Sequence, residues 1–130
     1  MALPNGAGGY QLGDGNVVEV NLVTQGTPVA KTAAAVLTAA EITSGIITYT
    51  GAVANLTFPT VALTEDLVSS AKNDSCFDLA IINIGGTNTV SVVAGTGWST
   101  VGSLAIAAGV SGRFLARKVG DLAWTLYRIA

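Results

Sequence analysis

The stretch SCFDLAIINIGG, residues 75–86, contains the run that decides the fold. From Leu79 to Ile82 every residue is apolar, which is typical of a central strand covered on both faces. Downstream, glycines separate four segments of strand length: residues 88–94, 103–108, 112–119 and 122–129. Short strands spaced by about ten residues, with glycine turns and no helices between them, indicate antiparallel sheets. We therefore expect a mainly β fold, an antiparallel, jelly-roll-like β-sandwich.

Two more strands are predicted upstream of this run. Residues 46–50 and 53–58 are rich in β-branched and aromatic side chains, and Gly51 lies between them. This arrangement predicts a hairpin. Residues 29–36 are rich in alanine and predict only a weak strand.

Two short helices are also expected. Thr38 and Glu41 have the spacing of a capping box, and Gly45 is placed to end the helical turn that the box begins. A second helix is predicted within residues 62–72, capped by Thr60 or Thr64. Its Leu63, Leu67 and Ala71 recur at spacings of four, as on one apolar helix face.

The N-terminal region divides at residue 16. Residues 1–16 contain five glycines and no hydrophobic period, so we expect a flexible arm whose larger side chains dock on neighbouring subunits. The candidate docking residues of this arm are Leu3, Pro4, Tyr10 and Leu12. Residues 17–22 alternate as in a strand with one buried face. The expected organisation is thus an arm, 1–16, and a β-sandwich domain, 17–130. The alternative is a leader that pairs within its own domain.

Composition favours a protein that is covered by other subunits. Of the 130 residues, 50% are hydrophobic and only 11% are charged, and a contiguous exposed apolar surface is usually an interface. The net charge of −2 argues against general nucleic-acid binding. No apolar run is long enough to span a membrane, and no secretory signal is visible, so we expect synthesis and retention in the cytoplasm of the producing cell.

The residues offer little catalytic chemistry. The chain has no histidine, which removes Ser-His and Cys-His pairs and the commonest metal ligand. Glu65 and Asp66 are adjacent near a helix start, where a structural role is expected. Cys76 is the only cysteine and is interpreted as a small buried hydrophobe. We expect no enzymatic activity, no cofactor and no metal.

Candidate interface residues gather near the C-terminus. Arg113, Arg117, Lys118 and Arg128 form one basic patch if their strands are adjacent, or they pair with nearby aspartates, which is the favoured interpretation. The last strand presents Trp124 on one face and Tyr127 on the other, and we expect both faces to be covered. Trp98 and Trp124 are interpreted as core or interface residues, and stacking on a sugar is the alternative.

Four segments resemble a known group of proteins. Residues 3–16, 37–60, 77–98 and 124–130 together resemble small capsid decoration, or cement, proteins of tailed bacteriophages. The resemblance implies a homotrimer on the outside of the head that contacts the major capsid protein and bridges capsomers. It also implies a location on the outer surface of the virion. Similar trimeric modules occur in phage fibres and tail tips, so a fibre or tail module that binds a host-surface glycan is the alternative.

Overall fold

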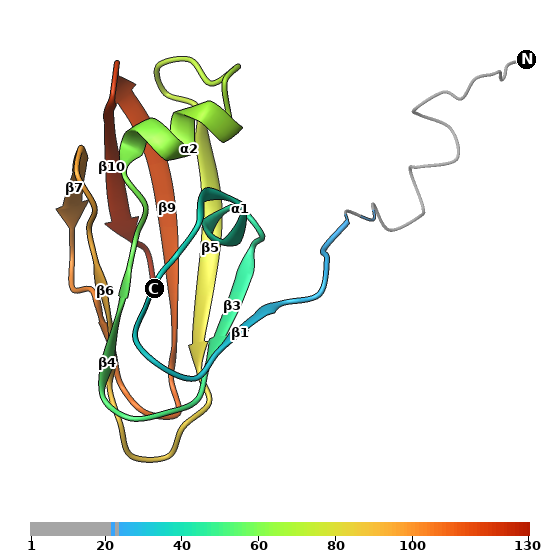
Figure 1. Cartoon of the computed structure of the whole chain (residues 1–130), viewed down its shortest axis with the longest axis vertical. Helices are drawn as coiled ribbons and strands as arrows, with labels where there is room; N and C mark the ends of the chain where they lie inside the picture. Colours follow the sequence, from blue (N-terminus) through green and yellow to red (C-terminus); the bar gives the residue numbers. More distant parts are fainter. Residues whose placement is uncertain (1–21, 23) are drawn as a thin grey trace, which may run out of the picture.

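The computed structural model describes residue 22 and residues 24–130, which form a mainly β fold of two sheets and two short helices (Figure 1). In chain order the elements are β1 (Val29–Lys31), β2 (Ala35–Val36), α1 (Ala39–Ile42), β3 (Ile46–Tyr49), β4 (Ala54–Thr57), α2 (Val61–Leu67), β5 (Cys76–Asn83), β6 (Val90–Val93), β7 (Trp98–Val101), β8 (Ala105–Ile106), β9 (Ser111–Gly120) and β10 (Ala123–Arg128). Residues 1–16, the predicted arm, and most of the strand predicted at 17–22 lie outside the described residues. Leu22 is described, is not in a strand and is 88% exposed.

Both sheets are mixed, which corrects the antiparallel expectation. The six-stranded sheet has the order β1-β3-β5-β9-β10-β7, and the four-stranded sheet has the order β2-β4-β6-β8. From β1 to β9 successive strands alternate between the sheets. The first three strands of each sheet are neighbours in chain order: β1, β3 and β5 run parallel, as do β2, β4 and β6. Parallel neighbours need a crossover connection. Here each crossover passes through a strand of the other sheet together with α1 or α2.

The same alternation overturns the predicted hairpin. β3 and β4 lie where strands were expected, but they belong to different sheets, and the link through Gly51 carries the chain from one sheet to the other. The Tyr49 hydroxyl donates a 2.6 Å hydrogen bond to the Ala52 carbonyl and fixes this link. Residues 29–36 likewise form two short strands, β1 and β2, in different sheets.

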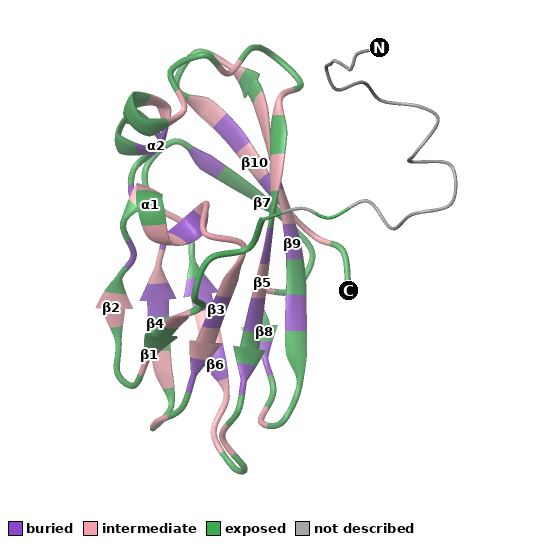
Figure 2. Ribbon diagram, turned by 90° about the vertical axis from the view of Figure 1, so that its right-hand side faces the viewer, coloured by how far each residue is buried: buried purple, intermediate pink, exposed green. Residues whose placement is uncertain are grey.

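One apolar core lies between the sheets, and the longer strands β5, β9 and β10 contribute alternate residues to it (Figure 2). β5 is central in its sheet, as predicted, with Leu79 and Ile81 buried. Its other face is not covered within the described chain, because Asp78 and Ile82 are exposed. Cys76 begins the outward series of the strand and is exposed, so its interpretation as a buried residue was wrong.

The two helices begin at predicted caps. Thr38 and Glu41 form the full capping box of α1, with hydrogen bonds of 3.2 and 3.0 Å. Thr60, rather than Thr64, caps α2, and the helix ends at Leu67, earlier than predicted. The predicted apolar face of α2 is therefore short, and Leu63 and Leu67 are 56% and 51% exposed.

Candidate functional site

The two tryptophans belong to the core. Trp98 is 9% exposed and Trp124 is 1% exposed, and their ring centroids are 5.9 Å apart. The Trp98 indole N–H donates a 2.8 Å hydrogen bond to the buried Pro59 carbonyl, and the Trp124 indole N–H donates a 3.0 Å bond to Glu65 Oε2. Both rings are held in place by packing and hydrogen bonds. Stacking of a sugar on Trp98 is not supported, because this residue is only 9% exposed and its ring packs against Phe58 and Trp124.

The first candidate surface is the outer face of the six-stranded sheet, where β5, β9 and β10 are adjacent. Alternation and burial place Asp78, Ala80, Ile82, Arg113, Leu115, Arg117 and Tyr127 on this face, which we call the outer sheet face. Leu115 is paired with Asp78 on one side and with Tyr127 on the other. Three of the predicted interface residues, Arg113, Arg117 and Tyr127, thus share one surface.

The arginines on the outer sheet face are paired, as the favoured interpretation predicted. Arg117 contacts Asp74 Oδ1 through Nη2 at 2.8 Å, and its Nη1 donates a 2.9 Å bond to the Tyr127 hydroxyl. These two hydrogen bonds, first that to Tyr127 and then that to Asp74, raise the pKa of Arg117. Arg113 contacts Asp78 at 3.4 Å. The face is close to neutral, with apolar side chains between two ion pairs.

The other two basic residues do not contribute to a basic patch. Lys118 has a side chain 12% exposed, lies 3.5 Å from Glu65 and donates to the Ala71 carbonyl. Arg128 stacks over the Phe114 ring, with Cζ 5.4 Å from its centroid, and donates to the carbonyls of Ser103 and Ala105. These contacts tie the Lys118 and Arg128 side chains to the folded core, so the two residues do not form a charged patch on the surface. The alternative of a single basic patch is therefore not supported.

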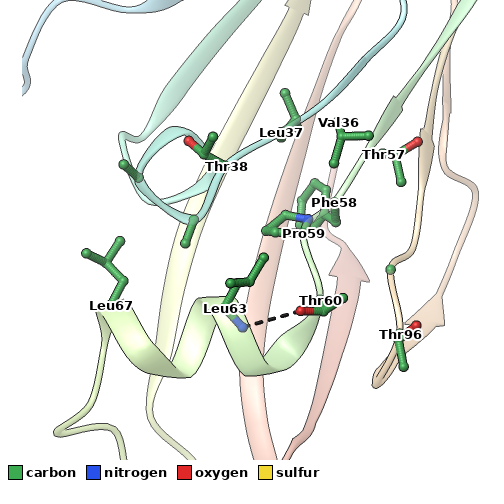
Figure 3. Close-up of a pocket in the computed structure, with 13 residues that line it drawn as sticks. Val36, Leu37, Thr38, Thr57, Phe58, Pro59, Thr60, Leu63, Leu67 and Thr96 are labelled. Atoms are coloured by element: carbon green, nitrogen blue, oxygen red, sulfur yellow. Dashed lines mark hydrogen bonds between the residues drawn. The ribbon is translucent and has the colours of Figure 1, made fainter.

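The second candidate surface is an apolar groove of about 710 Å³ beside the two helices (Figure 3). We define the apolar groove by its lining: Val36, Leu37, Thr38, Ala39, Ala40, Thr57, Phe58, Pro59, Thr60, Leu63, Leu67, Gly95 and Thr96. None of these side chains is charged. Val36, Leu63 and Leu67 are each more than half exposed, so the groove presents apolar side chains to solvent.

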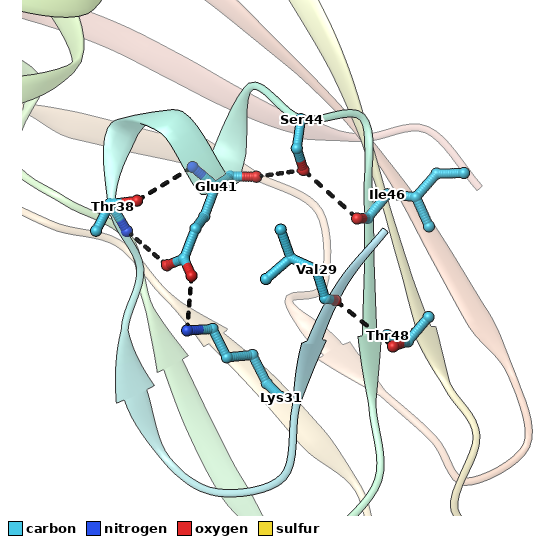
Figure 4. A network of polar contacts seen from close by, with 7 residues as sticks. All are labelled: Val29, Lys31, Thr38, Glu41, Ser44, Ile46 and Thr48. Atoms are coloured by element: carbon cyan, nitrogen blue, oxygen red, sulfur yellow. Dashed lines mark hydrogen bonds and ion pairs between the residues drawn. The ribbon is translucent and has the colours of Figure 1, made fainter. Parts of the chain in front are cut away.

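A polar network fixes one wall of the apolar groove (Figure 4). Glu41 accepts a hydrogen bond from the backbone N–H of Thr38 and contacts Lys31 Nζ at 2.7 Å, which joins α1 to β1. Burial is the largest single influence on the pKa of Glu41 and would raise it, but Lys31 and Thr38 together outweigh burial, so the pKa is lowered from 4.5. Glu41 is thereby kept ionised, and α1 is held in position.

Sequence reasoning did not identify the apolar groove. The sequence does contain one indication of it, the four-residue spacing of Leu63 and Leu67. This spacing was interpreted as the apolar face of a helix, and no binding partner was assigned to that face. The predicted interface residues Leu3, Pro4, Tyr10 and Leu12 lie outside the described residues.

Comparison with known proteins adds no relative. A scan of protein-family models, a search of curated proteins and a search of solved structures each gave no significant match. Among residues 22 and 24–130, no group of three or more Cys, Asp or Glu side chains is placed to hold a metal ion. No helix in the same part of the chain is long and apolar enough to cross a membrane.

Proposed function

We propose that this chain is a non-enzymatic structural protein of a tailed bacteriophage, a capsid decoration protein. In this proposal it has a jelly-roll-like β-sandwich fold and binds the outer surface of the head as a homotrimer. It contacts the major capsid protein and stabilises the shell by bridging capsomers.

The observation that supports the proposal best is the apolar surface of a chain with few charges. Among residues 22 and 24–130, thirteen large hydrophobic side chains are more than a third exposed: Leu22, Val36, Val53, Leu63, Leu67, Ile82, Ile84, Val93, Val101, Val110, Val119, Leu122 and Ile129. Contiguous apolar patches on soluble proteins commonly mark interaction surfaces. On the outer sheet face the arginines are already paired within the chain, so a partner can cover this face without leaving those charges unpaired.

Shell stabilisation follows from binding to the assembled state. A ligand that binds the assembled shell and not its separated subunits shifts the equilibrium toward the shell. In the proposal, residues 1–16 of each copy add a further contact to a neighbouring subunit. Three linked arms would tighten overall binding by about 10² to 10⁴ relative to a single arm.

The fibre or tail alternative receives no comparable support. Its candidate sugar platforms were Trp98 and Trp124, and both indole N–H groups are bonded within the chain, to the Pro59 carbonyl and to Glu65 Oε2. The decoration role is therefore the one proposed.

Co-sedimentation with phage heads that lack the protein tests this proposal. The full chain should pellet with expanded heads, whereas a chain without residues 1–16 should remain a soluble trimer that binds at least about tenfold more weakly. Ile82→Lys, on the outer sheet face, should also weaken binding, because it places an unpaired charge in the contact. Val53→Lys, at a 72% exposed position outside both surfaces, is the matched control. Equal binding by all four proteins would contradict the proposal.

A further inference from the structure

The apolar groove lies beside the free edge of the four-stranded sheet. β2 is the first strand in the order β2-β4-β6-β8, so it has a strand neighbour on one side only. Val36 of β2 lines the groove and is 70% exposed. An open strand edge beside apolar side chains is the arrangement to which an extended peptide can add.

The described chain begins close to this groove. The side-chain amide of Gln25 donates a 2.6 Å hydrogen bond to the carbonyl of Ser44, which follows α1. Ala39 and Ala40, at the other end of α1, line the groove. A four-residue helix is only about 6 Å long, so this contact of Gln25 lies within about one helix length of the groove.

The N-terminal segment has the length and chemistry to occupy the groove. Leu12 precedes Gln25 by 13 positions, which span up to roughly 43 Å when extended, several times the length of α1. Tyr10 and Leu12 are two positions apart, so in an extended backbone both side chains point to the same side. Residues 1–13 contain no charged side chain, and neither does the groove lining.

We infer that residues 8–13 of the same chain bind in the apolar groove, with Tyr10 and Leu12 inserted between α1 and α2. A tether this short gives a high effective concentration, of the order of millimolar, which favours the segment of the same chain over one from another copy. Glycines 8, 9 and 13 flank the two side chains and allow close approach of the backbone to β2. This binding concerns the isolated protein and does not depend on the capsid proposal; on heads, the contact with a neighbouring subunit proposed above requires that the segment leave the groove.

Disulfide trapping tests the inference directly in the full chain. Cys76 is the only cysteine and is exposed, so Cys76→Ser gives a clean background at a tolerant position. In that background the pair Leu12→Cys and Leu63→Cys should form an intrachain disulfide, seen as a fast-migrating monomer on non-reducing gels. Leu12→Cys with Val53→Cys is the matched control, because Val53 is exposed and outside the groove. A disulfide between chains, or a yield equal to that of the control, would overturn the assignment.

Hydrogen exchange gives a second readout without cysteines. Amides of residues 8–13 should exchange about tenfold more slowly in the unmodified chain than in Leu63→Lys, whose charge would enter the groove. Val53→Lys should keep the protection. Rapid exchange of these amides in the unmodified chain would show that the groove does not bind them. Because neither experiment contains heads, a failure here is distinguishable from a failure of the capsid proposal.

Discussion

Replacement of Trp98 by phenylalanine tests whether this residue is a structural element rather than a ligand platform. In the unmodified chain the ring centroids of Trp98 and Phe58 are 5.3 Å apart in an edge-on contact, which the smaller ring keeps. The smaller ring has no N–H to donate to the Pro59 carbonyl. Within the part of the chain that the structure describes, no second donor reaches this carbonyl. A buried acceptor without a partner costs about 1–3 kcal/mol, and the smaller ring adds about 1 kcal/mol.

We therefore expect Trp98→Phe to lower the free energy of unfolding by about 3 kcal/mol. For about a hundred folded residues this corresponds to a fall of roughly 13 °C in the unfolding midpoint. Urea unfolding followed by far-ultraviolet circular dichroism measures the change. The matched control is Trp124→Phe, after which Glu65 Oε2 still accepts from the Leu122 N–H at 3.2 Å and contacts Lys118 at 3.5 Å. The control should lose about 1 kcal/mol less.

Two results would refute this reasoning. One is a Trp98→Phe protein within about 0.5 kcal/mol of the unmodified chain, because the indole hydrogen bond would then contribute little. The other is a larger loss for Trp124→Phe than for Trp98→Phe. The first result would show that the Pro59 carbonyl finds another partner or is exposed to water, and the second would show that the Trp124 indole bond to Glu65 contributes more than the Trp98 bond.

Three further outcomes follow from single contacts. Because the pKa of Glu41 is lowered in the fold, its contribution of about 1 kcal/mol to stability is present above pH 4.5 and is lost as the pH falls through the lowered value. Urea titrations across acid pH should show this loss, and Glu41→Gln should abolish the pH dependence. Asn83→Leu deletes a buried amide that donates to the Asn88 and Ile106 carbonyls at 2.8 and 3.0 Å. A thermal melt should show a loss of about 3 kcal/mol in the free energy of unfolding, and an unchanged melt would contradict the assigned role. Gly97→Ala places a Cβ 2.9 Å from the Val61 side chain at a backbone φ of +92°, and urea unfolding should show a loss of about 3 kcal/mol. The control Gly109→Ala has a φ of +72° but open space around its Cβ, and it should lose about 1 kcal/mol. Equal losses for the two variants would contradict this explanation.

Local signals in the sequence predicted the elements well. The capping box of Thr38 and Glu41 places its partners three residues apart, so the helix start could be read directly from the chain. The apolar run from Leu79 to Ile82 correctly indicated the central strand. These features depend on residues that are neighbours in sequence, so a single chain reveals them.

Strand pairing depends on distant residues, and here the sequence was misleading. A glycine between two β-rich segments, as at Gly51, indicates a turn but does not say which sheet the next strand joins. The chain alternates between the sheets, and each parallel crossover passes through a strand of the other sheet. Cys76 was misassigned for a related reason: the inward series of β5 begins one residue later, at Phe77.

The candidate surfaces were predicted only in part. The pairing of Arg113 and Arg117 with nearby aspartates followed from charge alone and is confirmed by their contacts with Asp78 and Asp74. The apolar groove could not be predicted, because its lining comes from β2, α1, α2 and the links around Phe58 and Thr96, which only the fold brings together.

Electron cryo-microscopy of phage heads saturated with the protein tests the central claim most directly. The account expects trimeric density of this fold on the outer surface of the expanded shell, in contact with the major capsid protein of neighbouring capsomers, with the outer sheet face covered. Heads without added density, or density confined to the tail or fibres, would contradict a capsid decoration role.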